Sequence, residues 1–314
     1  FLGRIEKTST LIKSGYRGSQ KVGVTVKCFY HTDLDGKCSA AIVKRHWDNR
    51  ALIHSVDQST EYVPIDYSMV FPLGSVQLEE TVFIVDFSLS VTDMDALLKR
   101  TNQVVWVDHH RTAIERFTGH RAMDLPGLRD ISEAGCVLTW RYLFPDLSAP
   151  EAVVLVGDRD IWRWEFRDRT KFFNSGMYAV ENRPEASIWS DLFKKSSYVD
   201  NVYVTNIVDN GITVERYREK WFADFRKAWM FESEIDGHKC ACLNLMHTGS
   251  EAFGELEKEY PVLLLFVFNG ERYKVSLYSA MGVDVGRIAE KFGGGGHPGA
   301  AGFQCDELPV HKKP

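Results

Sequence analysis

The sequence predicts an α/β protein with a parallel-sheet N-terminal domain that has helices on both faces, a helical linker, and a smaller α+β C-terminal domain. Short apolar runs alternate with helical patterns through the first half of the chain, which is typical of a parallel sheet covered on both faces. A long amphipathic pattern at 212–231 interrupts this alternation. Three runs of strand length and one further helix follow it, which indicates a second domain of mixed type.

Length and composition support two folded domains. The chain has 314 residues, of which 44% are hydrophobic and 26% are charged, as in ordinary globular proteins. At roughly 150 residues per domain, this length predicts about two domains. We place them at 1–205 and 236–314, with the linker at 206–235. No apolar run approaches the roughly 18–20 residues of a membrane helix, so we expect no membrane contact.

Charge and cysteine content narrow the function classes. Lys and Arg number 38 against 43 Asp and Glu, a net charge of −5, whereas proteins that hold long duplexes usually present a basic surface. This balance argues against long-duplex binding and leaves room for a short phosphate-bearing substrate. The six cysteines form no C-x-x-C pair and no signal peptide is recognisable, which favours a reducing, cytoplasmic location.

The elements of the first domain follow from apolar runs and capping signals. Strands are expected at four apolar, partly β-branched runs: 22–30, 51–56, 81–85 and 103–107. Helices are expected at 36–47, 90–100 and 132–144. The second of these helices begins with a capping-box pattern of Ser90 and Asp93. The apolar run at 152–156 is ambiguous in type, and residues 1–21 are expected to form a polar arm with a short helix.

Asp and His residues repeatedly follow the apolar runs. After 22–30 comes His31-Thr-Asp33-Leu-Asp35-Gly36, after 81–85 comes Asp86, after 103–107 comes Asp108-His109-His110, and after 152–156 come Asp158 and Asp160. The carboxyl ends of parallel strands lie along one sheet edge, so these side chains are expected to converge. A single Asp after a strand is most often a turn residue or a helix cap, but four such endings in order are hard to explain as turns.

Crowded carboxylates indicate bound cations, because their mutual repulsion otherwise pushes several of them to take up protons. Oxygen ligands with some imidazole suit manganese or magnesium better than structural zinc. The ligands exceed the number that one ion needs, and two ions sharing a bridging Asp would use them all. Two metal ions about 3.5–4 Å apart are typical of phosphoryl hydrolysis, in which they generate a hydroxide nucleophile.

A run of four glycines before His297 is the second candidate for binding. It follows the helix expected at 283–292 and precedes a small-residue run at 298–303 that resembles a helix start. A flexible linker is one interpretation. The other, which we favour, is a nest of backbone N–H groups at a helix N-terminus that binds phosphate.

These residues resemble a known family. His31-x-Asp33-x-Asp35-Gly36, Asp86, Asp108-His109-His110 and Asp160 are similar to the four motifs of the DHH phosphoesterase superfamily. The stretch from Val275-Ser-Leu-Tyr-Ser279 through Phe292-Gly-Gly-Gly-Gly-His297 to Ala300-Ala-Gly302 resembles the DHH-associated C-terminal domain. The resemblance spans about 22–303, and the ordered set is far more specific than the Asp-His-His tripeptide.

The resemblance implies two Mn²⁺ ions, or Mg²⁺, in the N-terminal domain. One ion would be held by His31, Asp33 and Asp86. The other would be held by Asp35, Asp86, His109 and Asp160, so that Asp86 bridges them. Asp158 remains an alternative to Asp160, which we favour because Ile161-Trp162 follows it as in relatives.

The resemblance also assigns catalytic and substrate-binding roles. Asp108 would orient a ligand, and His110 would face the scissile phosphate as a charge stabiliser or leaving-group acid. The far end of the substrate, in a cleft between the domains, would be held by Gly294, Gly295, Gly296 and His297. Many relatives carry Arg where this chain has Tyr278, so a phosphate clamp is weaker here or a base stacks instead.

The implied activity is that of a manganese-dependent phosphodiesterase, an exoribonuclease that hydrolyses short oligonucleotides or linear dinucleotides to nucleoside monophosphates; a homodimer is compatible with it. The alternatives are a cyclic-dinucleotide phosphodiesterase, a RecJ-like single-strand exonuclease, a hydrolase of small phosphate esters, and a non-catalytic binding protein. Trp162 and Trp164 either stack on a base or pack in the core, and we expect core packing.

Overall fold

The computed structural model describes residues 24–54, 58–67, 69–194, 201–246 and 248–312. The chain divides into two units, Phe1–Val214 and Glu215–Pro314. The long helix α9 (Val202–Trp229) contributes residues to both units. No helix in the described ranges combines the length and the apolar character needed to cross a membrane.

Four parallel strands form the sheet of the first unit, in the order β2-β1-β3-β4. Their bounds are β1 (Val24–His31), β2 (Gln58–Ile65), β3 (Thr81–Val85) and β4 (Val104–Val107). In register, Tyr30 lies opposite Val85, which in turn lies opposite Val107. The carboxyl ends of the three strands β1, β3 and β4 therefore meet at one edge, as the sequence predicts for a parallel sheet.

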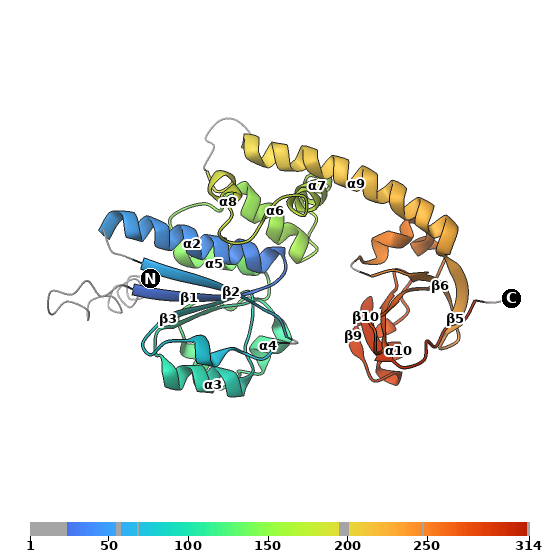
Figure 1. The fold of residues 1–314 in the computed structure, drawn as a ribbon, viewed down its shortest axis with the longest axis horizontal. Helices are drawn as coiled ribbons and strands as arrows, with labels where there is room; N and C mark the ends of the chain where they lie inside the picture. Colours follow the sequence, from blue (N-terminus) through green and yellow to red (C-terminus); the bar gives the residue numbers. More distant parts are fainter. Residues whose placement is uncertain (1–23, 55–57, 68, 195–200, 247, 313–314) are drawn as a thin grey trace. The chain divides into compact units, whose positions relative to one another are not determined.

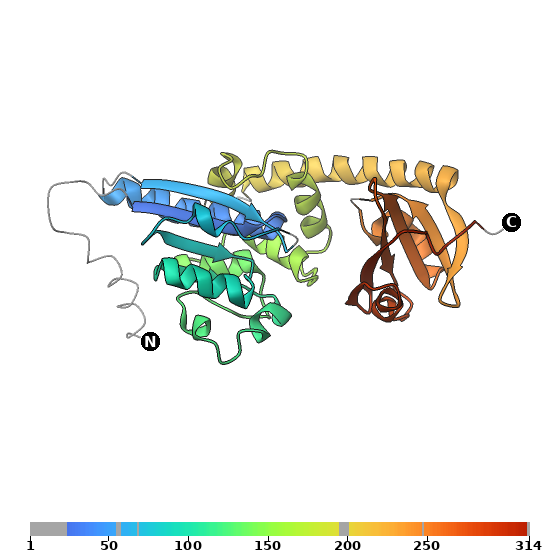
Figure 2. The same ribbon diagram turned by 60° about the horizontal axis from the view of Figure 1, so that its bottom comes forward.

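Helices cover both faces of this sheet (Figures 1 and 2). On one face, α2 (Leu34–His54) and α5 (Gly135–Leu143) pack through Val43 and Leu138 on strand residues such as Cys28. On the other face, α3 (Val91–Arg100) packs through Met94 and Leu97 on the buried Ile84. Ser90 caps α3 by accepting a hydrogen bond from the backbone N–H of Asp93 at 3.0 Å, so the predicted capping signal is confirmed.

The rest of the first unit is helical. Its elements are η2 (Leu73–Ser75), α4 (Arg111–Glu115), η3 (Arg121–Asp124), α6 (Glu151–Asp160), α7 (Asp168–Met177) and α8 (Ile188–Leu192). A hydrophobic core that includes Trp140 and Phe173 joins α2, α5, α6, α7, α8 and the first part of α9.

One strand prediction is wrong, and one run of ambiguous type is helical. The strand expected at 51–56 lies within α2 over residues 51–54, because the helix continues through the helix-favouring Ala and Leu without a breaker; residues 55–57 lie outside the described part of the chain. The second strand is instead β2, whose polar sequence reflects its place at the sheet edge. The run at 152–156, whose type the sequence leaves open between strand and helix, lies in α6. The expected arm at 1–21 lies outside the described residues.

The second unit is built on a mixed six-stranded sheet, in the order β5-β6-β7-β8-β10-β9. Its strands are β5 (Phe231–Ile235), β6 (His238–Asn244), β7 (Val262–Phe268), β8 (Tyr273–Tyr278), β9 (Gly295–His297) and β10 (Ala300–Cys305). Strands β6 and β7 are parallel, and the other pairs are antiparallel.

Alternating residues of the central strands face two separate cores. Leu264 and Leu277 pack against α10 (Val285–Lys291), whereas Leu263 and Leu265 pack against η4 (Ser250–Lys258) and Phe222 of α9. This period of two is the pattern of a sheet covered on both faces.

The helix expected to begin in 298–303 is wrong, because this run forms the turn and strand β10 of a hairpin with β9. The glycines follow the carboxyl end of α10 and do not begin a helix. A Cβ on Gly294 would lie 2.1 Å from the carbonyl oxygen of Gly302, and Gly296 has a φ of +147°. The small residues therefore allow the two strands and α10 to approach closely.

Candidate metal centre

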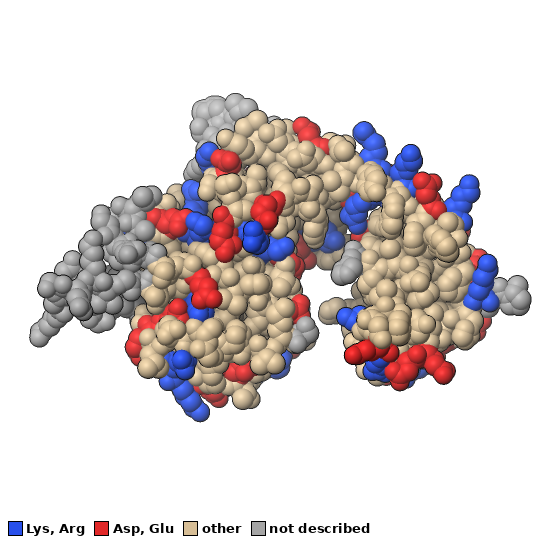
Figure 3. Space-filling view, in the orientation of Figure 1, with Lys and Arg blue, Asp and Glu red and all other residues tan. Residues whose placement is uncertain are grey.

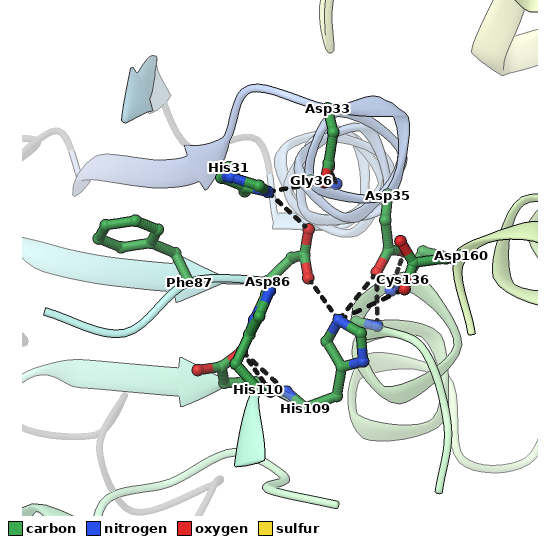
Figure 4. A network of polar contacts seen from close by, with 12 residues as sticks. His31, Asp33, Asp35, Gly36, Asp86, Phe87, His109, His110, Cys136 and Asp160 are labelled. Atoms are coloured by element: carbon green, nitrogen blue, oxygen red, sulfur yellow. Dashed lines mark hydrogen bonds and ion pairs between the residues drawn. The ribbon is translucent and has the colours of Figure 1, made fainter. Parts of the chain in front are cut away.

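A cluster of Asp and His side chains gathers where β1, β3 and β4 end (Figure 4). Helix α6 adds Asp160 from its last turn, and the first turn of α5 faces the same point. Groups of potential ligand atoms lie within 4.8 Å of one another, formed by His31, Asp33, Asp35, Asp86, His109, His110 and Asp160. Although the run that forms α6 is a helix and not a strand, its last turn brings Asp160 to the sheet edge.

The first group surrounds His31. The Nδ1 atom of His31 lies 2.7 Å from Asp33 Oδ2 and 3.7 Å from Asp86 Oδ2. Burial lowers the pKa of His31, but its contacts with Asp33 and Asp86 outweigh burial and raise this pKa to about 10. The site thus attracts positive charge strongly at this point.

The second group surrounds His109. Its Nε2 atom lies 3.1 Å from Asp86 Oδ1, 3.4 Å from Asp160 Oδ2 and 3.8 Å from Asp35 Oδ2. Asp86 belongs to both groups, with one carboxylate oxygen directed at each of them (Figure 4). The two groups of potential ligands therefore share this carboxylate.

Asp86 is buried, and the side-chain nitrogens nearest to its carboxylate belong to His31 and His109. It follows β3 directly, its backbone N–H donates to the Val107 carbonyl at 2.9 Å, and its φ of +54° is left-handed. The residue is 1% exposed, and within the described part of the chain neither side-chain oxygen accepts a hydrogen bond. A buried carboxylate in this condition is costly unless a cation neutralises it. Oδ2 of Asp160 is in the same condition.

The other carboxylates confirm this demand for positive charge. Both oxygens of Asp35 accept hydrogen bonds at 2.7 Å from the backbone N–H groups of Gly135 and Cys136, at the positive end of α5. Even so, burial raises the pKa of Asp35 to about 8, with the Asp86 charge adding to the rise. Burial, followed by the charge of Asp35, raises the pKa of Asp160 to about 7. The donor set, and the mutual repulsion that these raised pKa values reflect, fit divalent cations such as Mn²⁺ or Mg²⁺.

Gly135 is a site residue that the sequence interpretation missed. A Cβ at this position would lie 2.7 Å from Asp86 Cβ, 2.8 Å from Asp86 Oδ1 and 3.0 Å from Asp35 Oδ2. Only glycine lets the start of α5 approach both carboxylates this closely. The available signal was a glycine at the start of a predicted helix, where helix propensity disfavours it.

Asp108 organises the loop that carries the two histidines. It is fully buried, and its Oδ1 accepts from the backbone N–H groups of His109 and His110 at 2.8 and 3.2 Å. The same oxygen lies 2.8 Å from His110 Nδ1, and the Ser88 hydroxyl donates to Oδ2. With Nδ1 engaged, Nε2 is the nitrogen of His110 that remains for a ligand.

Asp158 and Asp160 have different surroundings. Asp158 is buried, and its carboxylate accepts from the backbone N–H groups of Glu165 and Phe166 and from the Thr170 hydroxyl. Asp160 points to His109 instead. Of the two alternatives, the structure places Asp160 in the cluster and makes Asp158 the anchor of the loop after α6.

The residues expected to bind the far end of the substrate lie in the second unit. Gly294 directly precedes β9, and Gly295, Gly296 and His297 form this exposed edge strand. Strand β9 pairs with β10 on one side only, so its outer backbone edge faces away from the sheet.

Comparison with known proteins gives a family match within the second unit and relatives that align with most of the chain. Residues 249–313 match the family model of the DHHA1 domain. The chain is 24% identical over 296 residues to an uncharacterized protein of Acanthamoeba polyphaga mimivirus, covering 89% of this chain and 67% of that protein. It is 22% identical over 293 residues to the oligoribonuclease NrnB of Bacillus subtilis (strain 168), covering 87% and 71%.

Among solved structures, the DHH domain from a member of a ribosomal-protein family has a TM-score of 0.57 to this chain at 12% identity, covering 90% of this chain and 83% of that one. This likeness shows a shared fold.

Proposed function

Because the chain belongs to the DHH phosphoesterase superfamily and carries a DHHA1 domain, we propose that it is a phosphodiesterase dependent on two Mn²⁺ or Mg²⁺ ions. It hydrolyses short oligonucleotides or linear dinucleotides to nucleoside monophosphates. The observation that supports this proposal is Asp86, a buried carboxylate that directs one oxygen to each of two ligand groups.

The ligands divide between the two groups. His31, Asp33 and Asp86 hold one ion, and the other is held by Asp35, Asp86, His109 and Asp160. When bound, the ions lower the pKa of the attacking water and neutralise the phosphoryl oxygens.

His110 is oriented by Asp108 through Nδ1, so that Nε2 meets the scissile phosphate as a charge stabiliser or as the acid for the leaving group. Because Gly135 has no side chain, the start of α5 can lie close to both Asp35 and Asp86.

The net charge and one named relative support a short substrate. One relative is named an oligoribonuclease. The net charge is −5, and on the face of the first unit seen in Figure 3 acidic and basic side chains are interspersed. Two divalent ions would add about +4 at the cluster alone, which draws in a small anion without building the basic track that a long polymer needs. We assign Gly294, Gly295, Gly296 and His297 to substrate binding, and through it to the choice of substrate length.

The decisive experiment replaces Asp86 by Ala. We expect turnover to be abolished and bound manganese, measured by mass spectrometry of the metal, to fall, because both ions lose a ligand. Asp146→Ala, at an exposed turn, is the matched control and should keep both properties. Near-normal manganese-dependent activity in Asp86→Ala would show the two-metal assignment to be wrong.

A substrate panel tests the substrate class. It compares 5′-phosphorylated RNA and DNA of two to about twenty nucleotides with cyclic dinucleotides and resolves the products. Fastest cleavage of the two- to five-residue substrates is expected. Equal or faster degradation of long strands would replace this proposal by a RecJ-like exonuclease, and preference for the cyclic substrates would replace it by a cyclic-dinucleotide phosphodiesterase.

A further inference from the structure

The loop between α6 and α7 exposes a tryptophan two residues after Asp160 of the candidate metal centre. Trp162 is 64% exposed, so the core packing expected for it is wrong. It follows Asp160, whose carboxylate contacts His109, by only two residues. Since consecutive Cα atoms are about 3.8 Å apart, Trp162 lies within about 7–8 Å of Asp160 along the backbone. An indole this exposed loses the burial that normally stabilises tryptophan.

The backbone of this loop adopts conformations that its side chains disfavour. Trp162, Trp164 and Arg167 have φ values of +55°, +55° and +48°. Bulky residues rarely occupy the left-handed region, and strain of this kind is retained where the surroundings impose it, often at ligand sites. Three such residues within six positions indicate that the fold imposes the conformation in which the loop exposes Trp162.

Buried and ionic contacts hold the loop in place. The Asp158 carboxylate, 3% exposed, accepts from the Glu165 and Phe166 backbone N–H groups at 2.9 and 3.3 Å, and its carbonyl accepts from Arg163 N–H at 3.0 Å. On the other side, the Arg163 guanidinium donates to the Ser132 carbonyl and to Glu133 Oε2, both at 3.1 Å.

The two acceptor residues, Ser132 and Glu133, directly precede Ala134 and Gly135 at the start of α5. The loop is therefore tied to the metal cluster from both ends, through Asp160 on one side and the α5 entrance on the other.

The indole of Trp162 is backed by a cation. The Arg159 guanidinium lies 4.1 Å from the Trp162 ring centroid and 5.1 Å from that of Trp164, and the two indoles meet edge to face at 5.7 Å. Arg159 and Trp164 thereby fix the orientation of Trp162 while most of its surface stays open.

We propose that Trp162, oriented by Arg159, is a stacking platform for a nucleobase of the substrate whose phosphate is bound at the metal centre. This inference rests on the proposed function and adds to it a source of affinity that does not depend on base identity, because every base offers a flat aromatic face. It assigns the binding of the base to the first unit, next to the reacting phosphate.

The kinetic test compares Trp162→Ala, Trp162→Phe and wild type on two substrates. One is 5′-phosphorylated diadenylate, and the other is the same backbone with both bases removed. For Trp162→Ala we expect KM for diadenylate to rise by about 5-fold to 100-fold, with kcat and the base-free reaction little changed. Trp162→Phe retains a ring and should stay near wild type. Trp229→Ala is the matched control, because Trp229 is 65% exposed on α9.

A loss that is equal for the two substrates, or no loss on diadenylate, would overturn the platform. Calorimetric titration of the manganese-loaded protein with AMP and with ribose 5-phosphate provides a readout that needs no hydrolysis. The wild type should bind AMP more tightly by about the same 5-fold to 100-fold factor, and Trp162→Ala should lose this difference.

Equal affinities for the two ligands in the wild type, no detectable AMP binding, or a difference that survives in Trp162→Ala would contradict the proposal. A base preference that is lost in Trp162→Ala in a protein that cleaves no phosphodiester would support the platform while refuting the proposed function, so the two failures are distinguishable.

Discussion

Gly135→Ala is a small substitution with a large expected effect. The added Cβ would lie 2.7 Å from Asp86 Cβ, whereas ordinary contact begins at 3.4 Å, so Asp86 or the start of α5 must move by about 0.7 Å. Metal–ligand distances tolerate only about 0.2 Å. A displacement approaching 1 Å at a catalytic centre costs about 100-fold in rate, and we expect a loss of that order together with reduced manganese content.

The fold should survive this change, because alanine is favoured over glycine in a helix by up to about 1 kcal/mol. The assay therefore measures three properties of one preparation: the circular dichroism spectrum with its melting temperature, the manganese content, and the manganese-dependent rate. Gly74→Ala is the matched control, since a Cβ there has open space around it and an ordinary φ. A folded Gly135→Ala protein with full metal content and full rate would refute the steric reasoning.

Three further predictions follow from the site. In metal-depleted protein, folding raises the pKa of Asp160 from 3.8 to about 7. The stability linked to this shift, roughly 4 kcal/mol as an upper bound, is fully present below about pH 4 and is lost as the pH rises through 7. Manganese should therefore raise the melting temperature more at pH 8 than at pH 5, and equal shifts would contradict the metal assignment. His297→Ala should raise KM or weaken the length preference with metal content intact, and a loss of metal would argue against its assignment to substrate binding. Asp158→Ala should lower the free energy of unfolding by roughly 2–3 kcal/mol, because it removes hydrogen bonds to a buried carboxylate, while metal content stays close to wild type; depletion of metal would place Asp158 among the ligands.

The elements that the sequence predicts well are those with strong hydrophobic patterns. Strands β3, β4 and β7 are apolar along their length, so their burial is visible in the residues themselves. Strand β2 is polar because it lies at the sheet edge. The run at 152–156 is too short for its period to separate a strand from a buried helix, and only packing against α5 and α7 makes it helical.

The convergence of His31, Asp86 and His109 could be predicted from the sequence alone, because each follows an apolar run and parallel strands end at one edge of a sheet. The features that could not be predicted from the sequence depend on the folded structure itself. The role of Gly135 comes from residues 49 and 100 positions earlier in the chain that contact it only after folding. The outward position of Trp162 comes from left-handed φ values that no residue preference predicts.

Helix α9 supplies side chains to two cores and leaves its middle without such support. Val204, Ile207 and Val208 pack in the first unit, and Phe222 packs in the second. Between Ile212 and Phe222, α9 contributes no residue to the hydrophobic clusters of the described chain, and Tyr217 is 69% exposed. The free energy of local opening depends on such packing, so we expect it to be higher in the two packed parts of α9 than in the stretch between them. The amide hydrogens of α9 should exchange fastest at the centre, the reverse of an ordinary helix that frays from its termini.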